Sequence, residues 1–128
     1  MFEKELPECI FYDFDGVMTD NQVLVDENCM EYVYVNRSDG YAISKMKELG
    51  IVQIIVSTET NSVVERRGEK LQIPVIHGIN DKGKAINKYC EYHGYNPQNT
   101  IFIGQELAGK IFLRNRLQYP IKSCNMVL

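Results

Sequence analysis

The chain has 128 residues, of which 45% are hydrophobic and 24% charged, with a formal net charge of -3 and four widely spaced cysteines. This composition is typical of one domain, over residues 1–128, whose cysteines are reduced. It argues against a zinc site, nucleic acid as main partner and a membrane span. Because the N-terminus has no basic region followed by an apolar core, we expect no signal peptide and a cytoplasmic location.

The first predicted element is a short apolar run that ends in carboxylates. Residues 9–13 read Cys-Ile-Phe-Tyr-Asp, which is typical of a parallel strand buried on both faces. Asp13 and Asp15 stand one residue apart, and Gly16 allows a sharp turn after them. Ligands bind outside the carboxyl ends of strands in open α/β sheets, and two close carboxylates repel each other there. We therefore expect a divalent cation held by oxygen ligands; the alternative is an acidic strand end that faces solvent.

Residues 13–20, Asp-Phe-Asp-Gly-Val-Met-Thr-Asp, resemble motif I of the haloacid dehalogenase superfamily of phosphatases. More narrowly, they resemble its small-cap branch, which acts on 3-deoxy-manno-octulosonate 8-phosphate and on the 9-phosphates of sialic acid and ketodeoxynononate. The resemblance extends to about Leu117. It implies a magnesium-dependent phosphomonoester hydrolase in which Asp13 attacks phosphorus and forms an aspartyl-phosphate. Asp15 would protonate the leaving group and later activate water.

Two strands are predicted next, over 22–25 and 31–35, joined by a polar turn. Both faces of the second strand carry large residues, because tyrosines and valines alternate along it. Two interpretations stand: the hairpin is buried against another chain, or it packs on its own domain. The resemblance implies that this hairpin, at about 22–35, is the whole cap and that it assembles into the core of a homotetramer.

A helix is predicted up to Gly50, with Ser38 or Asp39 as its N-cap. Its apolar stripe consists of Ala42, Ile43, Met46 and Leu49. The sequence Arg37-Ser38-Asp39-Gly40-Tyr41 also matches a loop near the substrate in the resembled family. The resemblance therefore implies that Arg37 and Asp39 bind substrate, although capping is by itself a sufficient explanation for Asp39.

A second buried strand, over 51–56, ends in Ser57-Thr58-Glu59. A hydroxyl at such a strand end, near a helix N-terminus, is a good phosphate ligand. Ser57 resembles the motif II Ser/Thr of the superfamily, and we assign phosphate binding to Ser57 and Thr58, with helix capping as the alternative. Glu59 is similar to the Glu of the Thr-Gly-Glu sequence in the nine-carbon branch, which implies contact with the substrate.

The next predicted helix, over 63–71, carries Arg66 and Arg67. They are either a solvated face or, as a similar pair in the resembled family implies, ligands of the sugar carboxylate, which suits an arginine fork. After a short strand over 73–76, Asp81 is the predicted N-cap of another helix. Lys82 stands at the start of that helix, where the macrodipole disfavours a cation, so its position indicates a local anion. It resembles the motif III lysine, which holds the nucleophile and the phosphoryl group together.

A fourth core strand is predicted over 99–104. The resembled family continues with Gly-Asp-Asp-x-x-Asp, whereas this chain reads Gly-Gln-Glu-Leu-Ala-Gly from Gly104 to Gly109. The first Asp of that motif is normally a magnesium ligand, so the resemblance assigns the metal to Asp13, Asp15 and Gln105. The altered motif favours a second hypothesis: a catalytically weakened or inactive homologue that serves as a binding or assembly subunit.

Strands alternate with helices along the chain, which predicts right-handed crossovers. The expected fold is α/β: a Rossmann-like parallel sheet with helices on both faces and a minimal β-hairpin cap. The substrate class that the resemblance implies is a phosphorylated eight- or nine-carbon 2-keto-3-deoxy sugar acid, of the kind made in sialic acid or lipopolysaccharide precursor biosynthesis.

Overall fold

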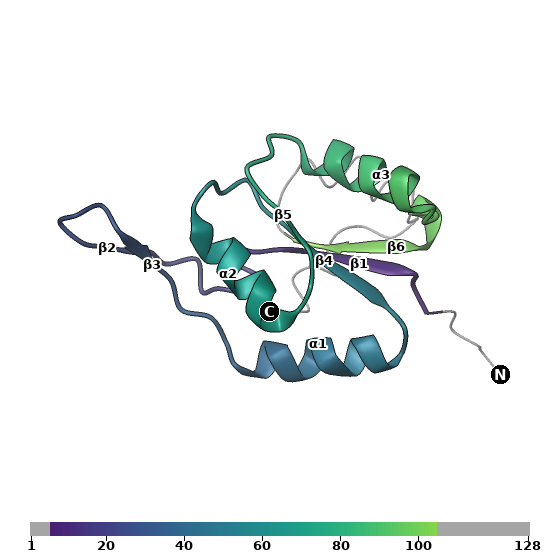
Figure 1. Ribbon diagram of the computed structural model, residues 1–128, viewed down its shortest axis with the longest axis horizontal. Coiled ribbons are helices and arrows are strands. Elements are labelled where there is room, and N and C mark those ends of the chain that lie inside the picture. Colours follow the sequence, from purple (N-terminus) through teal and green to yellow (C-terminus); the bar gives the residue numbers. More distant parts are fainter. Residues whose placement is uncertain (1–5, 105–128) are drawn as a thin grey trace.

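The computed structural model describes residues 6–104. Four parallel strands form one sheet in the order β5-β4-β1-β6 (Figure 1). These strands are β1 (Cys9–Asp13), β4 (Val52–Val56), β5 (Val75–Ile76) and β6 (Thr100–Ile103). The chain builds outward from β1 to β5 and then returns to the other side of β1 to add β6. Such a reversal of strand order is where ligands bind in open α/β sheets.

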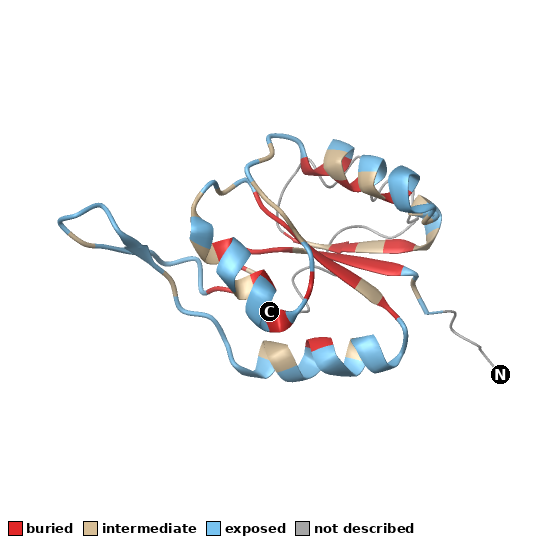
Figure 2. Ribbon diagram, in the orientation of Figure 1, coloured by how far each residue is buried: buried red, intermediate tan, exposed pale blue. Residues whose placement is uncertain are grey.

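Helices cover both faces of this sheet, which confirms the predicted α/β class. They are α1 (Ser38–Glu48), α2 (Ser62–Leu71) and α3 (Lys82–His93), and a short 3-10 helix, Pro97–Asn99, precedes β6. In Figure 1, α3 lies on one face, whereas α1 and α2 lie on the other. Each face has its own apolar cluster, the first centred on Phe11, Ile86 and Phe102 and the second on Phe14, Ile55 and Val64. The buried residues of Figure 2 follow these two interfaces.

The polar residue that interrupts the apolar run of β4 has a structural explanation. Gln53 is buried, and its side chain joins three elements. Its Oε1 accepts a hydrogen bond from the Tyr12 hydroxyl at 2.7 Å, and its Nε2 donates to the Ile43 carbonyl at 2.9 Å. A buried amide with both ends satisfied is not costly. It links β1, β4 and α1 just below the sheet edge at which Asp13 lies.

The predicted N-cap of α1 is wrong. Arg37 occupies the N-cap position and makes no side-chain cap hydrogen bond, while Ser38 is already helical. Asn36 takes over the role, because its Oδ1 accepts from the Ser38 backbone N at 2.9 Å and from the Ser38 hydroxyl at 2.6 Å. Asp39 lies in the first turn, where its negative charge favours the helix without any capping bond.

The apolar stripe of α1 is narrower than expected. Ile43 is buried and Met46 is half-buried, but Ala42 and Leu49 are exposed. The far half of the helix is held instead by Lys47, whose Nζ donates to the carbonyls of Leu71 at 3.1 Å and Gln72 at 2.8 Å. A cation at the C-terminus of α2 is also favoured by the helix dipole, so a polar clamp replaces part of the predicted apolar contact.

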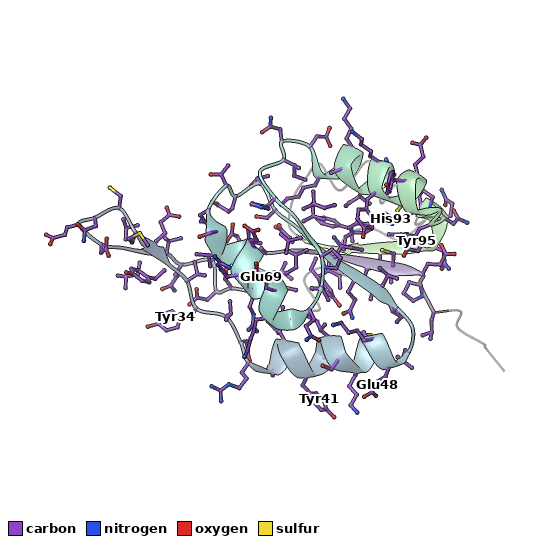
Figure 3. All side chains as sticks on the ribbon, in the orientation of Figure 1. Tyr34, Tyr41, Glu48, Glu69, His93 and Tyr95 are labelled. Atoms are coloured by element: carbon purple, nitrogen blue, oxygen red, sulfur yellow. The ribbon has the colours of Figure 1, made fainter. Side chains whose placement is uncertain are left out.

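The hairpin consists of β2 (Leu24–Val25) and β3 (Glu31–Tyr32), which are shorter than the predicted strands. A bridge between Thr19 and Val35 closes its base, and it projects away from the sheet (Figure 1). Val33 is half-buried against the second apolar cluster, but the rest of the strand pair is exposed. Tyr34, for example, is 77% exposed (Figure 3). The interpretation that the hairpin packs on its own domain is therefore wrong for most of its length, apart from Val33 and the Glu31 side chain, which accepts a hydrogen bond from Asn61.

Within residues 6–104, no helix is both long and apolar enough to cross a membrane. Among the described residues, Cys9, Cys29 and Cys90 form no disulfide.

Candidate active site

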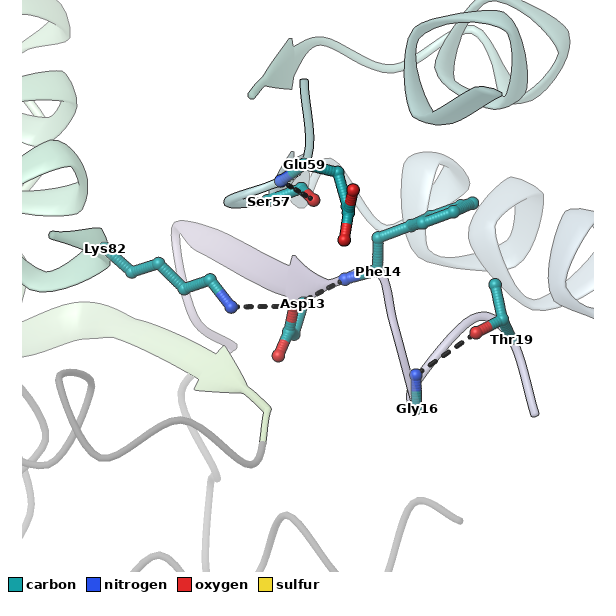
Figure 4. Close-up of polar contacts among 7 residues, drawn as sticks. All are labelled: Asp13, Phe14, Gly16, Thr19, Ser57, Glu59 and Lys82. Atoms are coloured by element: carbon teal, nitrogen blue, oxygen red, sulfur yellow. Dashed lines mark hydrogen bonds and ion pairs between the residues drawn. The ribbon is translucent and has the colours of Figure 1, made fainter. Parts of the chain in front are cut away.

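The carboxyl edge of the sheet gathers three polar side chains in an almost dry environment. Asp13 ends β1, Ser57 follows β4, and Lys82 begins α3; their exposed fractions are 3%, 1% and 2%. Lys82 Nζ lies 2.9 Å from Asp13 Oδ1 (Figure 4). The same carboxylate oxygen accepts a hydrogen bond from the Phe14 backbone N at 2.8 Å. A buried carboxylate is thereby held by a cation and by the backbone, in a defined orientation.

The position of Lys82 results from the local structure of α3. Asp81 is the N-cap, as predicted, and its side chain accepts from the Lys84 backbone N at 3.0 Å. The next side chain is directed into the sheet edge rather than into solvent, because Lys82 is buried and Lys84 is exposed. The local anion that the sequence indicated is Asp13.

The motif I loop is a tight turn stabilised by its own backbone and by Thr19. Met18 N donates to the Phe14 carbonyl at 2.8 Å, and Gly16 adopts a φ of 78°, which disfavours any residue with a Cβ. The Thr19 hydroxyl accepts from Gly16 N at 3.2 Å and from Asn21 N at 3.1 Å (Figure 4). This network fixes the turn that presents Asp15 two residues after Asp13.

The carboxyl of Asp15 has an unusual electrostatic environment. Burial raises the pKa of Asp15, and the nearby Glu59 carboxylate raises it further, by repulsion and by a hydrogen bond that favours the protonated form. Glu31 of β3 acts in the same direction on this pKa, whereas Lys82 opposes them. A carboxyl held toward its protonated form is suited to donate a proton to a leaving group.

Asp15→Asn should make the protein more stable at neutral pH. Because the pKa of Asp15 is raised on folding, the native state binds this proton more tightly than the unfolded chain does. The stability contributed by the protonated group is therefore present at low pH and is lost as the pH rises above about 4. In thermal melts with chelator, the Tm advantage of Asp15→Asn should grow from pH 4 to pH 7. Adding Glu59→Gln should reduce that growth, and a Tm difference independent of pH would contradict the assignment.

Ser57 and Thr58 do not cap α2. The N-cap is Asn61, whose Oδ1 accepts from the Val63 backbone N at 3.2 Å, so the capping alternative for the two hydroxyls is wrong. Ser57 is buried, and its Oγ accepts from the Glu59 backbone N at 3.1 Å. Thr58 is exposed. The structure therefore brings Ser57, but not Thr58, into the buried group around Asp13.

The residues predicted to contact substrate lie around two different cavities. Arg37 and Asp39 line a cavity of about 720 Å³ together with residues 16–21 and the exit of the hairpin. Glu59 lines a smaller cavity of about 120 Å³ together with Asp15. Of the two, only the smaller cavity has a carboxyl of the Asp13–Asp15 pair in its wall. Asp15 therefore adjoins the smaller of these two cavities and not the larger one.

The two arginines of α2 differ in environment. Arg66 forms an exposed ion pair with Glu69 at 3.1 Å, as expected for a solvated face. Arg67 turns inward, and its Nη2 donates to the Asn36 carbonyl at 3.0 Å. Burial raises the pKa of Asp39, and the charge of Arg67 partly opposes that shift. Neither arginine lines the smaller cavity beside Asp15.

The predicted magnesium ligands are only partly described. Asp13 and Asp15 supply oxygen atoms of the kind that Mg²⁺ prefers, but Gln105 lies outside the described residues. Across residues 6–104, no three His, Cys, Asp or Glu side chains are arranged to hold a metal ion. The backbone after β6 nevertheless approaches this point closely, because a Cβ placed on Gly104 would lie 2.9 Å from Asp13 Cβ. The oxygen atoms of Asp13 and Asp15 are thus the kind of ligand that magnesium binds. Mg²⁺ in proteins often keeps several water ligands as well.

Sequence reasoning missed Glu31 and Asn61 near the site. Asn61 directly precedes a helix, which is a recognisable N-cap signal. No local pattern identifies Glu31 as a site residue, since its place beside Asp15 depends on where the hairpin lies relative to the rest of the domain.

No protein-family model matches the chain. A solved protein of Streptomyces avermitilis described as a HAD family hydrolase is similar in structure, with a TM-score of 0.79 and 36% identity over 86% of this chain. The 3-deoxy-D-manno-octulosonate 8-phosphate phosphatase of Moraxella catarrhalis, solved with magnesium, phosphate and a KDO molecule, gives a TM-score of 0.79 and 25% identity over 84% of this chain. Among curated proteins, the Danio rerio N-acylneuraminate cytidylyltransferase A is 24% identical over 112 residues, or 84% of this chain.

This chain spans only part of each of these proteins: 66% of the hydrolase, 63% of the phosphatase and 26% of the cytidylyltransferase. Over that part, the likeness includes both the sequence and the sheet that carries motif I. The family that the residues around Asp13 predicted is therefore confirmed, and the chain belongs to the haloacid dehalogenase superfamily of hydrolases.

Proposed function

We propose that this chain is a phosphomonoester hydrolase that acts through an aspartyl-phosphate on Asp13. The observation that carries the proposal is the buried ion pair of Asp13 and Lys82, at 2.9 Å, with the Ser57 hydroxyl at the same sheet edge. Burial of a carboxylate at a ligand-binding edge costs free energy. In a member of a hydrolase superfamily, a catalytic role of that carboxylate explains why the cost is tolerated.

In the proposed reaction, each of these residues has a separate role. Asp13 attacks phosphorus, the bond to the leaving oxygen breaks, and the proton of Asp15 passes to that oxygen. The Asp15 carboxylate then takes a proton from water, whose oxygen attacks phosphorus and releases phosphate, so that Asp13 is regenerated. Lys82 orients Asp13 and presents positive charge to the phosphoryl oxygens, and Ser57 offers a hydroxyl donor to them.

Magnesium would be held by the Asp13 carboxylate, the Asp15 backbone carbonyl and Gln105. When bound, it supplies positive charge against the phosphoryl oxygens. The presence of magnesium and phosphate in the solved phosphatase of Moraxella catarrhalis supports a divalent metal cofactor for this chain.

The proposed substrate is a phosphorylated sugar acid. Two relatives support this class through their names, one an octulosonate 8-phosphate phosphatase and the other an N-acylneuraminate cytidylyltransferase. The test is phosphate release from 3-deoxy-manno-octulosonate 8-phosphate, sialic acid 9-phosphate and a generic ester, with magnesium and with chelator. We expect magnesium-dependent release that is faster with a sugar acid than with the generic ester. No release from any ester at high enzyme concentration would instead favour the binding or assembly subunit that the altered motif IV suggests.

Gln105→Asp should tighten magnesium binding and increase turnover. A neutral amide oxygen is a poorer ligand than a carboxylate for a hard dication that gives up water reluctantly. Gly109 also stands where the resembled motif carries an acid, and groups that support metal ligands by hydrogen bonds change metal affinity or activity about 10- to 100-fold. Calorimetric titration with magnesium, alongside phosphate release, measures both effects. If the parent chain already saturates below about 1 mM magnesium and Gln105→Asp gains nothing, this ligand set is wrong.

We further propose that the hairpin forms the core of a homotetramer. Seven large apolar side chains of the hairpin are exposed: Val23, Leu24, Val25, Met30, Tyr32, Tyr34 and Val35. An apolar surface of this kind is typical of an interface with another chain. Light scattering at micromolar concentration should give a multiple of the 14.8 kDa chain mass, and Leu24→Asp should lower it. Tyr92→Asp, at an 84% exposed site on α3, is the matched control, and a clean monomer would contradict the proposal.

A further inference from the structure

Within one protomer, few contacts hold the hairpin in position. Its strands are two residues each and exposed on both faces, and isolated two-stranded hairpins are marginally stable. The bridge of Thr19 and Val35 closes its base, and Val33 packs on the body. Nearer the tip, the Glu31 side chain of strand β3 makes a polar contact with the body.

That contact is made by the side-chain amide of Asn61. Its Nδ2 donates to Glu31 Oε2 at 3.0 Å and lies 3.5 Å from Glu59 Oε2. Its Oδ1 accepts from the Val63 backbone N at 3.2 Å. One amide therefore joins the start of α2, the loop after β4 and the hairpin.

The choice of an amide at this position has an electrostatic consequence. Glu31 and Glu59 both act on Asp15 by repulsion, so three acidic groups lie close together. A donor between Glu31 and Glu59 reduces their mutual repulsion. Aspartate would cap α2 as well as asparagine does, but it would add a fourth negative charge and remove the donor.

The hairpin forms one wall of the smaller cavity. Val23, Glu31 and Val33 line it from the hairpin, and Phe14, Asp15 and Glu59 line it from the body. Asn61 stands in the same lining, at the seam between the two walls. If the hairpin moved away from α2, the part of the cavity wall that it supplies would be lost.

We infer that Asn61 is a positioning residue that latches the hairpin over the cavity beside Asp15, so that the hairpin wall contacts the leaving group of the substrate. The latch itself follows from the hydrogen bonds of Asn61, whereas its effect on catalysis rests on the proposed phosphatase function. Binding of a leaving group large enough to reach Val23 and Val33 would depend on the latch. A small leaving group would not reach the wall that these residues form, so its binding would not depend on the latch.

Two substitutions separate the latch from the cap. Asn61→Asp and Asn61→Ser both retain an N-cap acceptor for α2, but neither supplies the amide donor, and only Asn61→Asp adds repulsion. Asn96→Asp is the matched control, because Asn96 is also an N-cap, accepting from the Gln98 backbone N at 2.9 Å. Hydrogen exchange by mass spectrometry reports on residues 22–35, 62–71 and 82–93 separately in the full chain.

We expect residues 22–35 to exchange about 3- to 10-fold faster in Asn61→Asp, the range for one hydrogen bond. Asn61→Ser should have a smaller effect in the same direction, and Asn96→Asp should have none. Residues 62–71 and 82–93 should exchange as in the parent chain. Unchanged exchange of 22–35 in Asn61→Asp, or faster exchange confined to 62–71, would overturn the latch.

The catalytic consequence has a separate measurement. KM and kcat are compared for sialic acid 9-phosphate and for ethylene glycol monophosphate, whose leaving group is only two carbons long. In Asn61→Asp, KM for the larger ester should rise about 3- to 10-fold more than KM for the smaller one. Equal changes for the two esters would overturn the positioning role. If the parent chain hydrolyses neither ester, the proposed function fails, and the exchange data alone still decide whether the latch exists.

Discussion

Asp13→Asn should lower turnover by roughly 10³-fold or more, because an amide cannot serve as the nucleophile that forms the phosphoryl intermediate. The change is nearly isosteric, and the Asn side-chain oxygen can still accept the hydrogen bond that Phe14 N donates to Asp13 Oδ1 at 2.8 Å. The fold should therefore persist, with a lower free energy of unfolding because Lys82 loses its buried charged partner. Phosphate release and circular dichroism of the purified variant measure the two outcomes.

The control for this change is Glu91→Gln, the same acid-to-amide change at an exposed position of α3. It should leave both turnover and the circular dichroism spectrum unchanged. Retained phosphatase activity in pure Asp13→Asn would show that the nucleophile is another group.

Lys82→Met should destabilise the protein by about 3–5 kcal/mol, the usual cost of removing one partner of a buried ion pair. Lys82 and Asp13 are 3% and 5% exposed in their side chains, so water cannot replace the lost ammonium at the carboxylate. Methionine has a similar length and no charge, which limits the packing change. Urea denaturation at pH 7 gives the free energy of unfolding.

A double-mutant cycle identifies the cause of that loss. Asp13→Asn combined with Lys82→Met removes both buried charges, so the double variant should lose clearly less than the sum of the single losses. Lys84→Met, two residues along α3 at an exposed site, should change the free energy of unfolding by no more than about 0.5 kcal/mol. Additive losses would mean that the ion pair contributes no coupling.

Much of the framework was predictable from the sequence because its signals are local. The apolar run before Asp13 predicts a buried strand, and the structure places it in the interior of the sheet as β1. Asp81 was recognisable as an N-cap from its own chemistry. The pairing of Lys82 with an anion was also predictable, because the helix macrodipole disfavours a cation at a helix start unless an anion lies nearby.

Other features were decided by contacts between segments far apart in the chain. Whether Arg67 points to solvent or to the Asn36 carbonyl depends on how α2 packs beside the hairpin exit. The environment of Asp15 depends on Glu31 and Glu59, which come from different elements. Helical and strand periodicity indicate which face of an element is apolar. They do not indicate which charged side chains from different segments lie close together.

The sequence alone was enough to predict the chain order of strands and helices, the acids at the end of β1 and the N-cap of α3, because each depends on neighbouring residues. Contacts between distant segments place the hairpin outside the sheet and bring Glu31 to the Asn61 side chain, which donates a hydrogen bond to it. Thirty positions separate these two residues, and their contact is set by the packing of Val33 and the bridge at Thr19, which no local pattern encodes.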